Sequence, residues 1–335
     1  MNILPPHNSE NTSDPITGWE KISVLHKAGY VVEKDAWLTG AAPKRLISIY
    51  NVEGEEEKGD ANPLPWTKYI AKTAEKWHPV ECLTEYLINR IGIALGLPMN
   101  AVKLYQHESS LWFCSKLFLS EESDEILMHG TEICGHYMED LERAVAIADN
   151  QKQARGTFTY EFLSSAVSSL FPSRSEMLLN DLFRILVFDC LTGNNDRHFY
   201  NWGVITDTTQ APLRMAPIYD SARGLFWNAT DRSIQSKFQG QGGLQAYIAS
   251  YAENSRPRIS CKGKSKLNHF ELIRLLTSDN PEFKDIAHGL AGIKQETLAI
   301  ETLYLVASDH FSAFRMDAIE QLLRHRFESI RNVLK

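Results

Sequence analysis

The chain lacks the long apolar runs that cross membranes. A transmembrane helix needs about 20 predominantly apolar residues, and no segment of this 335-residue sequence comes near that length. Its first residues carry neither a basic start nor an apolar stretch, so we expect no signal peptide. We therefore expect a cytoplasmic protein without a membrane partner, with secretion by a route that needs no signal left open.

Cysteine is scarce, and positive charge is not in excess. The cysteines number five, an odd count, and lie far apart, which predicts neither a disulfide framework nor a zinc site. The formal net charge of −7 gives no bulk attraction to nucleic acid or to anionic membranes. We therefore expect no direct nucleic-acid partner.

The sequence also lacks a Walker motif and a clean glycine-rich phosphate loop. The nearest candidate, residues 38–45, holds one glycine, Gly40, and two basic residues, Lys44 and Arg45. A lone glycine is weak evidence, and a plain turn between strands explains the segment equally well. The sequence therefore names no residues that would cover a bound phosphate chain.

The most informative segment that is present covers residues 193–201, with the sequence Gly-Asn-Asn-Asp-Arg-His-Phe-Tyr-Asn. Asp196 is followed five residues later by Asn201, and Asp220 comes nineteen residues after Asn201. Phosphoryl transfer needs a carboxylate that accepts or orients a hydroxyl proton, together with hard oxygen ligands for Mg²⁺. The spacing therefore predicts a kinase-type centre, with Asp196 catalytic and with Asn201 and Asp220 as metal ligands.

The neighbouring sequence predicts how these groups converge. Residues 181–191 repeat apolar positions at helical spacing, and Gly193 is suited to end that helix. Strands are expected near 202–205 and 213–218, with a turn at 207–210. Asp196 and Asn201 would then lie on a loop after a buried helix, and the hairpin would return the chain to deliver Asp220.

Two neighbours of Asp196 have roles that the residues alone leave open. His198 is interpreted as an organiser of the catalytic loop, and a role as a base is the alternative. Arg197 would either contact a phosphate or tie the loop to a nearby carboxylate. Downstream, residues 255–266 alternate basic residues and serines, which suits either docking of an acidic substrate or a solvated loop.

Residues 191–198, 201–203 and 216–220 resemble the C-terminal kinase domain of HipA-like proteins, and among them most the short stand-alone members. The family consists of bacterial Ser/Thr kinases whose fold is distantly related to protein kinases and phosphatidylinositol kinases. The resemblance is sharp over about residues 180–225 and can be followed from about 66 to 275. It implies an ATP- and Mg²⁺-dependent serine/threonine protein kinase that transfers the γ-phosphate to protein hydroxyls and phosphorylates itself.

The resemblance also implies roles for single residues. Asp196 matches the catalytic aspartate, and Asn201 and Asp220 match the two metal ligands. Lys72, in a strand-like run, matches the ATP-binding lysine, for which Lys68 and Lys76 also compete. Glu85 lies on a predicted helix over residues 79–95 and would pair with Lys72. Phe118 marks the predicted hinge, where the backbone of residues 116–119 would bond the adenine.

The expected fold is α+β and two-lobed, like a protein kinase. Residues 1–18 are expected to be mobile, residues 19–135 to form a β-rich N-lobe with one helix, and residues 136–335 a mostly helical C-lobe. N-lobe strands are predicted near 20–25, 29–33, 45–52 and 68–73, with a hairpin at 102–105 and 112–119. C-lobe helices are predicted over 138–154, 162–170, 176–191, 267–276, 297–308 and 317–333.

The expected partner is a protein that offers Ser or Thr. Full-length members of the family work with a DNA-binding antitoxin, and because this chain shows no DNA-binding motif, an antitoxin or regulator would be a separate partner. Two other functions stay open. The loop also resembles that of phosphatidylinositol kinases, which suggests a lipid or small-molecule kinase, and a nucleotide-binding pseudokinase is the non-enzymatic alternative.

Overall fold

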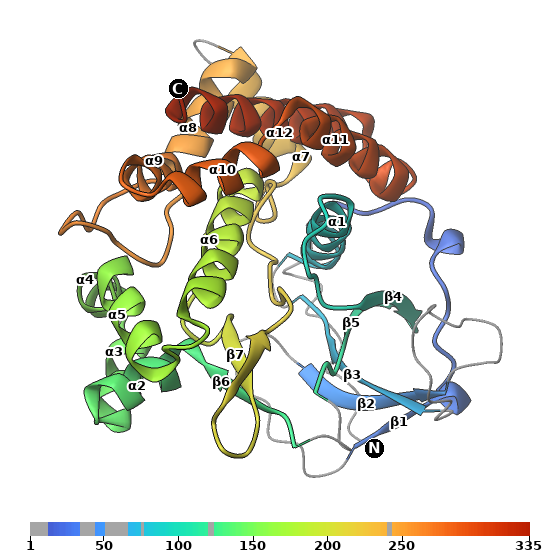
Figure 1. Cartoon of the computed structure of the whole chain (residues 1–335). Helices are drawn as coiled ribbons and strands as arrows, with labels where there is room; N and C mark the ends of the chain where they lie inside the picture. Colours follow the sequence, from blue (N-terminus) through green and yellow to red (C-terminus); the bar gives the residue numbers. More distant parts are fainter. Residues whose placement is uncertain (1–12, 34–43, 51–65, 75–76, 120–123, 240–242) are drawn as a thin grey trace.

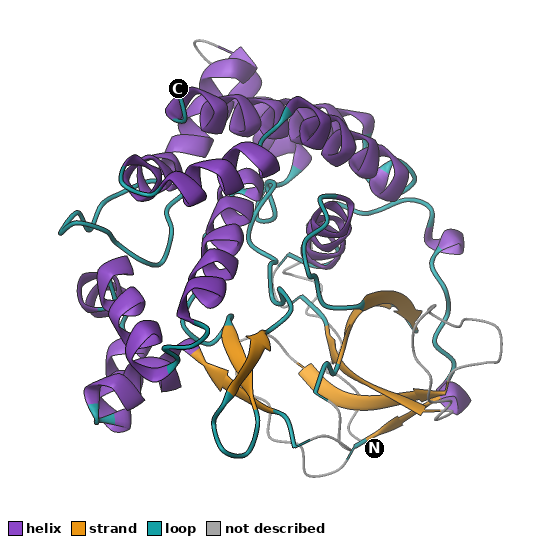
Figure 2. Cartoon of the chain, viewed as in Figure 1, coloured by secondary structure: helices purple, strands orange, loops and turns teal. Residues whose placement is uncertain are grey.

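The computed structural model describes residues 13–33, 44–50, 66–74, 77–119, 124–239 and 243–335. An antiparallel sheet forms the N-terminal part, and helices form most of the C-terminal part (Figures 1 and 2). This architecture confirms the predicted α+β class. The candidate phosphate loop lies outside the described residues at positions 38–43, and so does the competing Lys76.

The N-terminal sheet has the strand order β1-β2-β3-β5-β4, and every neighbouring pair is antiparallel. Its own small core includes Ile47, Tyr69 and Trp112. The predicted strands near 29–33, 45–52 and 68–73 and the predicted hairpin are present. The strands are β1 (Tyr30–Val32), β2 (Lys44–Tyr50), β3 (Trp66–Lys72), β4 (Val102–His107) and β5 (Ser110–Lys116).

The strand predicted over residues 20–25 is wrong. Trp19–Lys21 form a short 3₁₀ helix, η2, and a second one, η3, covers Lys27–Gly29. Only a single bridge, from Val24 to Gln106, joins the segment to β4. The reason is that the segment crosses between two parts of the molecule. The Thr17 N–H donates to the His310 carbonyl, Gly18 turns the backbone with a left-handed φ of 63°, and Ser23 and Leu25 then bond to Gln106 of β4.

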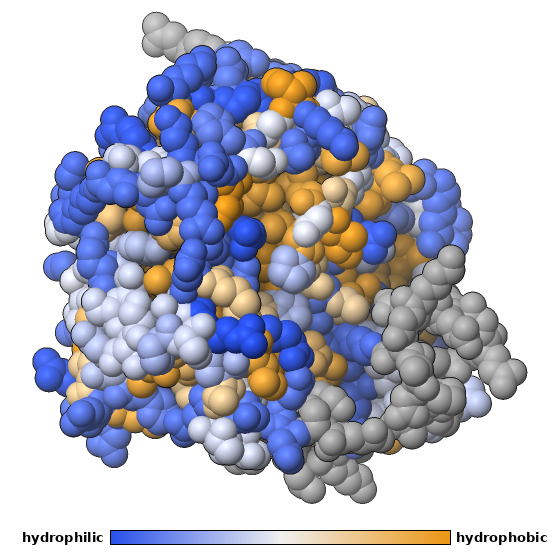
Figure 3. Space-filling view, viewed as in Figure 1, coloured by the Kyte–Doolittle hydropathy of each residue, from blue (hydrophilic) through white to orange (hydrophobic). Residues whose placement is uncertain are grey.

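Helix α1 (Val80–Ala94) packs against β4 and β5 on one side and against α11 on the other. Figure 3 shows apolar side chains gathered over α1 and α11 on this face. The segment 13–25 holds the start of α1 in place. The Ser13 hydroxyl accepts a hydrogen bond from the Val80 backbone N–H at 3.2 Å, and the Asp14 carboxylate pairs with buried Arg315 at 2.8 Å. Residues 13–18 therefore link α1 to helix α12.

The C-terminal part is built around α6 (Ser175–Thr192), which is buried on most of its circumference. A second sheet, of order β6-β7-β8, lies beside it. The strands of that sheet are β6 (Ile126–His129), β7 (Gly203–Thr206) and β8 (Pro212–Met215). The other helices are α2 (Gly130–Met138), α3 (Leu141–Asp149), α4 (Gln151–Thr157), α5 (Tyr160–Leu170), α7 (Asp231–Phe238), α8 (Gly243–Asn254), α9 (His269–Ser278), α10 (Pro281–Leu290), α11 (Ile293–Ala307) and α12 (Ala313–Val333).

The single helix predicted over residues 138–154 is wrong, because the segment is divided among α2, α3 and α4. Glu139 adopts a left-handed φ of 55°, which ends α2. Asp140 and Asn150 then cap the next two helices, and their side-chain oxygens accept backbone N–H groups of Arg143 and of Gln153. The predicted boundary at residue 135 cuts through α2, which packs on α3 and α5, and β6 pairs with β7.

In the described part of the chain, no helix combines the length and the apolar character that a membrane span requires.

Helix α6 ends where Gly193 takes a left-handed φ of 74°. A Cβ at that position would come within 3.2 Å of the buried Arg326 guanidinium, so glycine suits the site in both respects. This ending starts the loop 194–201, whose Asn195 N–H donates to the Arg223 carbonyl.

Candidate active site

Lys72, Glu85 and Asp220 meet in one ion cluster, although they come from β3, α1 and the segment after β8. The Lys72 Nζ lies 2.8 Å from Glu85 Oε1 and 2.5 Å from Asp220 Oδ1. It also lies 5.2 Å from the centre of the Phe113 ring. The structure therefore brings together the predicted lysine, its predicted glutamate partner and one of the two predicted metal ligands.

Burial and charge act against each other in this cluster. Burial disfavours the charged form of Lys72, but the carboxylates of Asp220 and Glu85 outweigh it and raise the pKa of Lys72. Burial raises the pKa of Glu85 to about 7, against the pull of Lys72. Burial also acts to raise the pKa of Asp220, but the positive charge of Lys72 outweighs burial and lowers this pKa to about 2. At neutral pH the cluster therefore holds a protonated lysine beside an ionised Asp220.

The catalytic-loop residues are held by short local hydrogen bonds. The Asn201 side-chain amide donates to the Asp196 carbonyl at 2.9 Å, and the His198 N–H donates to the same carbonyl at 2.8 Å. The His198 Nδ1 accepts from the Tyr200 backbone N–H at 3.3 Å. Burial lowers the pKa of His198, although Asp196 and Asp220 oppose this. The bond from the Tyr200 N–H to the His198 ring is what the organiser role requires.

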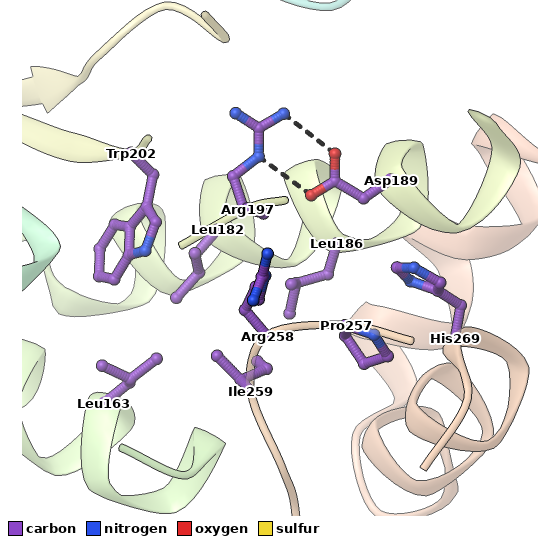
Figure 4. Close-up of a pocket in the computed structure, with 10 residues that line it drawn as sticks. All are labelled: Leu163, Leu182, Leu186, Asp189, Arg197, Trp202, Pro257, Arg258, Ile259 and His269. Carbon is purple, nitrogen blue, oxygen red and sulfur yellow. Dashed lines mark hydrogen bonds and ion pairs between the residues drawn. The ribbon is translucent and has the colours of Figure 1, made fainter. Parts of the chain in front are cut away.

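Arg197 ties the loop to its surroundings. Its Nε and Nη2 atoms make two 3.0 Å bonds to the carboxylate of Asp189 on α6, as Figure 4 shows. Its Nη1 donates to the backbone carbonyls of Asn201 at 2.8 Å and Tyr219 at 2.6 Å. The guanidinium is buried, so of the two predicted roles the tie to a carboxylate is the one present. Arg197 thereby fixes Asn201 and the residue before Asp220 to one helix.

Asn201 and Asp220 form a donor set that suits Mg²⁺. The Asn201 amide nitrogen is engaged with Asp196, which leaves the side-chain oxygen as the ligand atom. The Asp220 side chain is 39% exposed. The Asp220 backbone has a left-handed φ of 53°, which an aspartate tolerates better than most residues. Among the described residues no group of three or more His, Cys, Asp or Glu could hold a metal. One amide and one carboxylate are what Mg²⁺ uses when phosphate oxygens and water complete its shell.

A second lysine lies beside the ion cluster. Lys44 begins β2 and stands directly opposite Lys72 in the β2–β3 ladder, so both side chains project from the same face of the sheet. Burial lowers the pKa of Lys44, while Asp220 raises it. The sequence analysis named Lys44 only as one of two basic residues in the candidate phosphate loop, residues 38–45. Its place opposite Lys72 makes it a further candidate for binding phosphate.

The predicted hinge lies at the edge of the site. The Phe118 ring is 5.5 Å from the ring of Tyr219, the residue before Asp220. The backbone N–H of Leu117 donates to the Lys68 carbonyl at 2.9 Å and is thus used within the sheet. A small pocket lies beside the ion cluster, and its walls include Asn89, Phe113, Ser115, Tyr219 and Asp220.

Two arginines that sequence reasoning missed hold the Asp196 carboxylate. Arg258 Nη2 lies 2.5 Å from Oδ1, and Arg223 Nε lies 3.1 Å from Oδ2. Arg258 belongs to the predicted basic patch, but its guanidinium pairs with the Asp196 carboxylate. Arg256 instead donates to the Lys266 carbonyl, and Lys262 pairs with Asp279. No local pattern links Arg258 to Asp196, because 62 residues separate them.

Comparison with known proteins agrees with this architecture. The model of the HipA-like C-terminal domain family matches residues 36–292. The serine/threonine-protein kinase CtkA of Helicobacter pylori is 22% identical over 194 residues, which cover 57% of this chain and 54% of that protein. The chain thus spans about half the length of this curated relative.

Two solved structures have a similar fold. The crystal structure of the H. pylori proinflammatory kinase CtkA has a TM-score of 0.67 at 18% identity and covers 91% of this chain and 94% of that chain. The complex of HipA, HipB and operator DNA from a Shewanella oneidensis MR-1 toxin–antitoxin system has a TM-score of 0.53 at 13% identity. It covers 90% of this chain and 66% of that chain. The fold is therefore the kinase-like one predicted from the sequence.

Proposed function

Because this chain belongs to the family of HipA-like C-terminal domains, we propose that it is an ATP- and Mg²⁺-dependent serine/threonine protein kinase that also phosphorylates itself. The observation that carries the proposal is the placement of Lys72 between Glu85 and Asp220, at 2.8 Å and 2.5 Å. A lysine–glutamate pair beside a metal-binding aspartate is the arrangement that positions ATP phosphates in protein kinases.

Each group has a defined task in this reaction. Lys72, oriented by Glu85, binds the phosphates of ATP, and the backbone near Phe118 bonds the adenine. Asn201 and Asp220 hold Mg²⁺, which neutralises phosphate charge when bound. Asp196 orients the acceptor hydroxyl and receives its proton as the new oxygen–phosphorus bond forms. The bond between the γ-phosphorus and the β,γ-bridging oxygen breaks, and ADP leaves with the electron pair.

His198 and Arg197 act on the loop and not on the substrate. His198 keeps the turn between Asp196 and Asn201 in shape through the Tyr200 N–H. Arg197 keeps the loop at a fixed position relative to the Asp220 segment. Transfer between two bound groups depends on such positioning, because phosphoryl transfer demands little covalent chemistry from the protein.

The proposed setting is the cytoplasm, with a Ser- or Thr-containing protein as substrate. All five cysteines are buried and none is in a disulfide, which supports a reducing compartment. A separate antitoxin or regulatory protein is a further proposed partner, prompted by the HipA–HipB complex to which the fold is similar. Co-purification of the full chain with proteins from its own cells tests that part.

The proposed activity is tested with ATP labelled in its γ-phosphate. The wild-type chain is incubated with Mg²⁺, alone and with a generic basic protein, and modified residues are mapped by mass spectrometry. Label on Ser or Thr supports the proposal. Label only on phosphoinositides or on a small alcohol, offered in parallel, would favour the lipid or small-molecule kinase. ATP binding without any transfer would favour a pseudokinase.

A further inference from the structure

Both oxygens of the Asp196 carboxylate are engaged, one by each of two arginines. Arg258 takes Oδ1 at 2.5 Å and Arg223 takes Oδ2 at 3.1 Å. In the proposed reaction the acceptor hydroxyl must hydrogen-bond to one of these oxygens. Each carboxylate oxygen can accept more than one hydrogen bond, but the hydroxyl gains most room where an arginine is able to move away, and the structure distinguishes between the two arginines.

Arg258 makes two hydrogen bonds to the loop 194–201. Besides Oδ1 it donates through Nε to the carbonyl of Asn195 at 2.9 Å, so it grips both the side chain and the backbone of the loop. Its side chain is 17% exposed. Figure 4 shows Arg258 projecting from its own segment toward Arg197 and α6.

The segment that carries Arg258 is itself tethered at three points. The Ser255 hydroxyl donates to the Gly193 carbonyl at 3.0 Å, and the Arg155 guanidinium donates to the Pro257 carbonyl at 2.7 Å. The Ser260 carbonyl accepts from the Tyr160 backbone N–H at 2.9 Å. Withdrawal of Arg258 would break two hydrogen bonds at once, against a backbone that is fixed on either side.

Arg223 is held differently. It makes a single ion pair with Asp196, and its side chain is 37% exposed. Its guanidinium carbon lies 5.2 Å from the centre of the Trp227 ring. Its backbone is fixed, because the carbonyl accepts from the Asn195 N–H at 3.2 Å and a Cβ on the next residue, Gly224, would lie 2.5 Å from the Thr192 carbonyl oxygen. The mobile part of Arg223 is therefore its charged end.

A phosphoryl group that reacts at Asp196 lies within reach of this charged end. The acceptor oxygen sits about 3 Å from the carboxylate, and the phosphorus sits roughly 3–3.5 Å beyond the acceptor oxygen in a reactive geometry. A γ-phosphate offers a guanidinium more charge and more acceptor oxygens than one carboxylate oxygen does. Arg223 can thus exchange one anion for the other without movement of its backbone.

We propose that Arg258 is a positioning residue that permanently holds Asp196 through Oδ1, and that Arg223 leaves Oδ2 to bind the γ-phosphate of ATP. The inference rests on the proposed kinase function. It assigns to Arg223 the contact that distinguishes ATP from ADP, and it makes Oδ2 of Asp196 the oxygen that receives the acceptor hydroxyl. Arrival of ATP thereby opens the catalytic carboxylate to its substrate.

The test uses nucleotide binding, which does not require turnover. Isothermal titration calorimetry gives the Kd of the Mg²⁺ complexes of ADP and of the β,γ-imido analogue of ATP for four full-length chains. These are the wild type, Arg223→Ala, Arg258→Ala and a control, Arg232→Ala, on the exposed surface of α7. For Arg223→Ala we expect the Kd of the ATP analogue to rise about tenfold and the Kd of ADP to change less than about twofold. For the control we expect neither to change.

For Arg258→Ala we expect both Kd values to stay within about twofold of wild type while kcat falls at least about tenfold, with part of the rate restored in Arg258→Lys. Thermal unfolding of each variant reports whether it is folded. Equal weakening of both nucleotides in Arg223→Ala, or none, would overturn the assignment of Arg223. A changed nucleotide affinity or an unchanged kcat in Arg258→Ala would overturn that of Arg258. Failure of the wild type to bind either nucleotide would instead refute the proposed function on which both assignments rest.

Discussion

Arg197 and Asp189 form a buried, two-pronged ion pair that fixes the catalytic loop to α6. Both bonds are 3.0 Å, and the two side chains are only 4% and 1% exposed. The same guanidinium reaches the carbonyls of Asn201 and Tyr219. One residue thus sets the distance between the two candidate metal ligands, and this makes the pair the structural centre of the site.

Removal of one partner should be costly. In Asp189→Asn the charge of Arg197 stays buried without its counter-ion, and such losses destabilise a protein by about 3–5 kcal/mol. Urea unfolding of wild type and variant measures the difference. The matched control is Arg184→Ala on the same helix, whose partner is Asp181 and whose side chain is 40% exposed. That change should cost less than about 1 kcal/mol. Equal effects of the two substitutions would show that Arg197 is not an anchor.

Lys72 should carry most of the affinity for ATP. In Lys72→Ala the ion cluster loses the cation that is bonded to both Glu85 and Asp220, and two acids are left facing a bound phosphate chain. We expect ATP affinity to fall at least about tenfold in calorimetry. Lys68→Ala, four residues earlier on β3, tests the competing assignment. If Lys68→Ala weakens ATP binding as much as Lys72→Ala does, the cluster around Lys72 is not the phosphate site.

Asp220 should make the free energy of unfolding depend on pH in the acid range. Its pKa falls from 3.8 in the unfolded chain to about 2 in the folded protein, because Lys72 outweighs burial. A lowered pKa means that its stabilising contribution is present above about pH 3.8 and is lost as the pH drops through about 2. The stability difference between wild type and Asp220→Asn, followed by denaturant unfolding, should therefore shrink as the pH falls from 4 toward 2. A difference that does not depend on pH would contradict the ion pair.

Gly224 should not tolerate a side chain. A Cβ at this position would lie 2.5 Å from the Thr192 carbonyl oxygen, and because the clash is with backbone the segment must shift. We expect Gly224→Ala to lower the unfolding midpoint and to impair transfer, since Asp220 and Arg223 move with the segment. Gly156→Ala in α4, where a Cβ meets no atom within 4 Å, is the control and should be neutral or stabilising. A neutral Gly224→Ala would show that the segment has room to move.

The residues predicted from short patterns were found together. Asp196 and Asn201 lie within one loop, and the hairpin that brings Asp220 back is local, so spacing alone was informative. The pairing of Lys72 with Glu85 was implied by the family resemblance, and the strand and the helix that carry the two residues are neighbours in the chain. Helical periodicity located α1 and α6 because each carries a continuous apolar pattern.

Contacts between segments that are distant in the sequence could not be predicted from such local patterns. Arg258 reaches Asp196 only because residues 255–261 are tied to α4, α5 and the end of α6, which no local signal encodes. Helices α7 and α8 are absent from the helices predicted above. Each buries few residues, among them Ile234 in α7 and Ile248 in α8, and packing on other helices stabilises them more than their own sequence does. The apolar pattern over residues 138–154 appeared continuous, but polar N-cap residues such as Asp140 divide the segment into separate helices.

The most direct test of the central claim compares wild type with Asp196→Asn. Asparagine keeps the size of the side chain and removes its ability to accept a proton. Transfer of labelled γ-phosphate is measured with Mg²⁺, and ATP binding is measured on the same preparations by calorimetry. We predict that wild type labels Ser or Thr, that Asp196→Asn loses at least about 10²-fold in rate, and that Asp196→Asn binds ATP at least as tightly as wild type. Full activity in Asp196→Asn would contradict the assignment of the catalytic site.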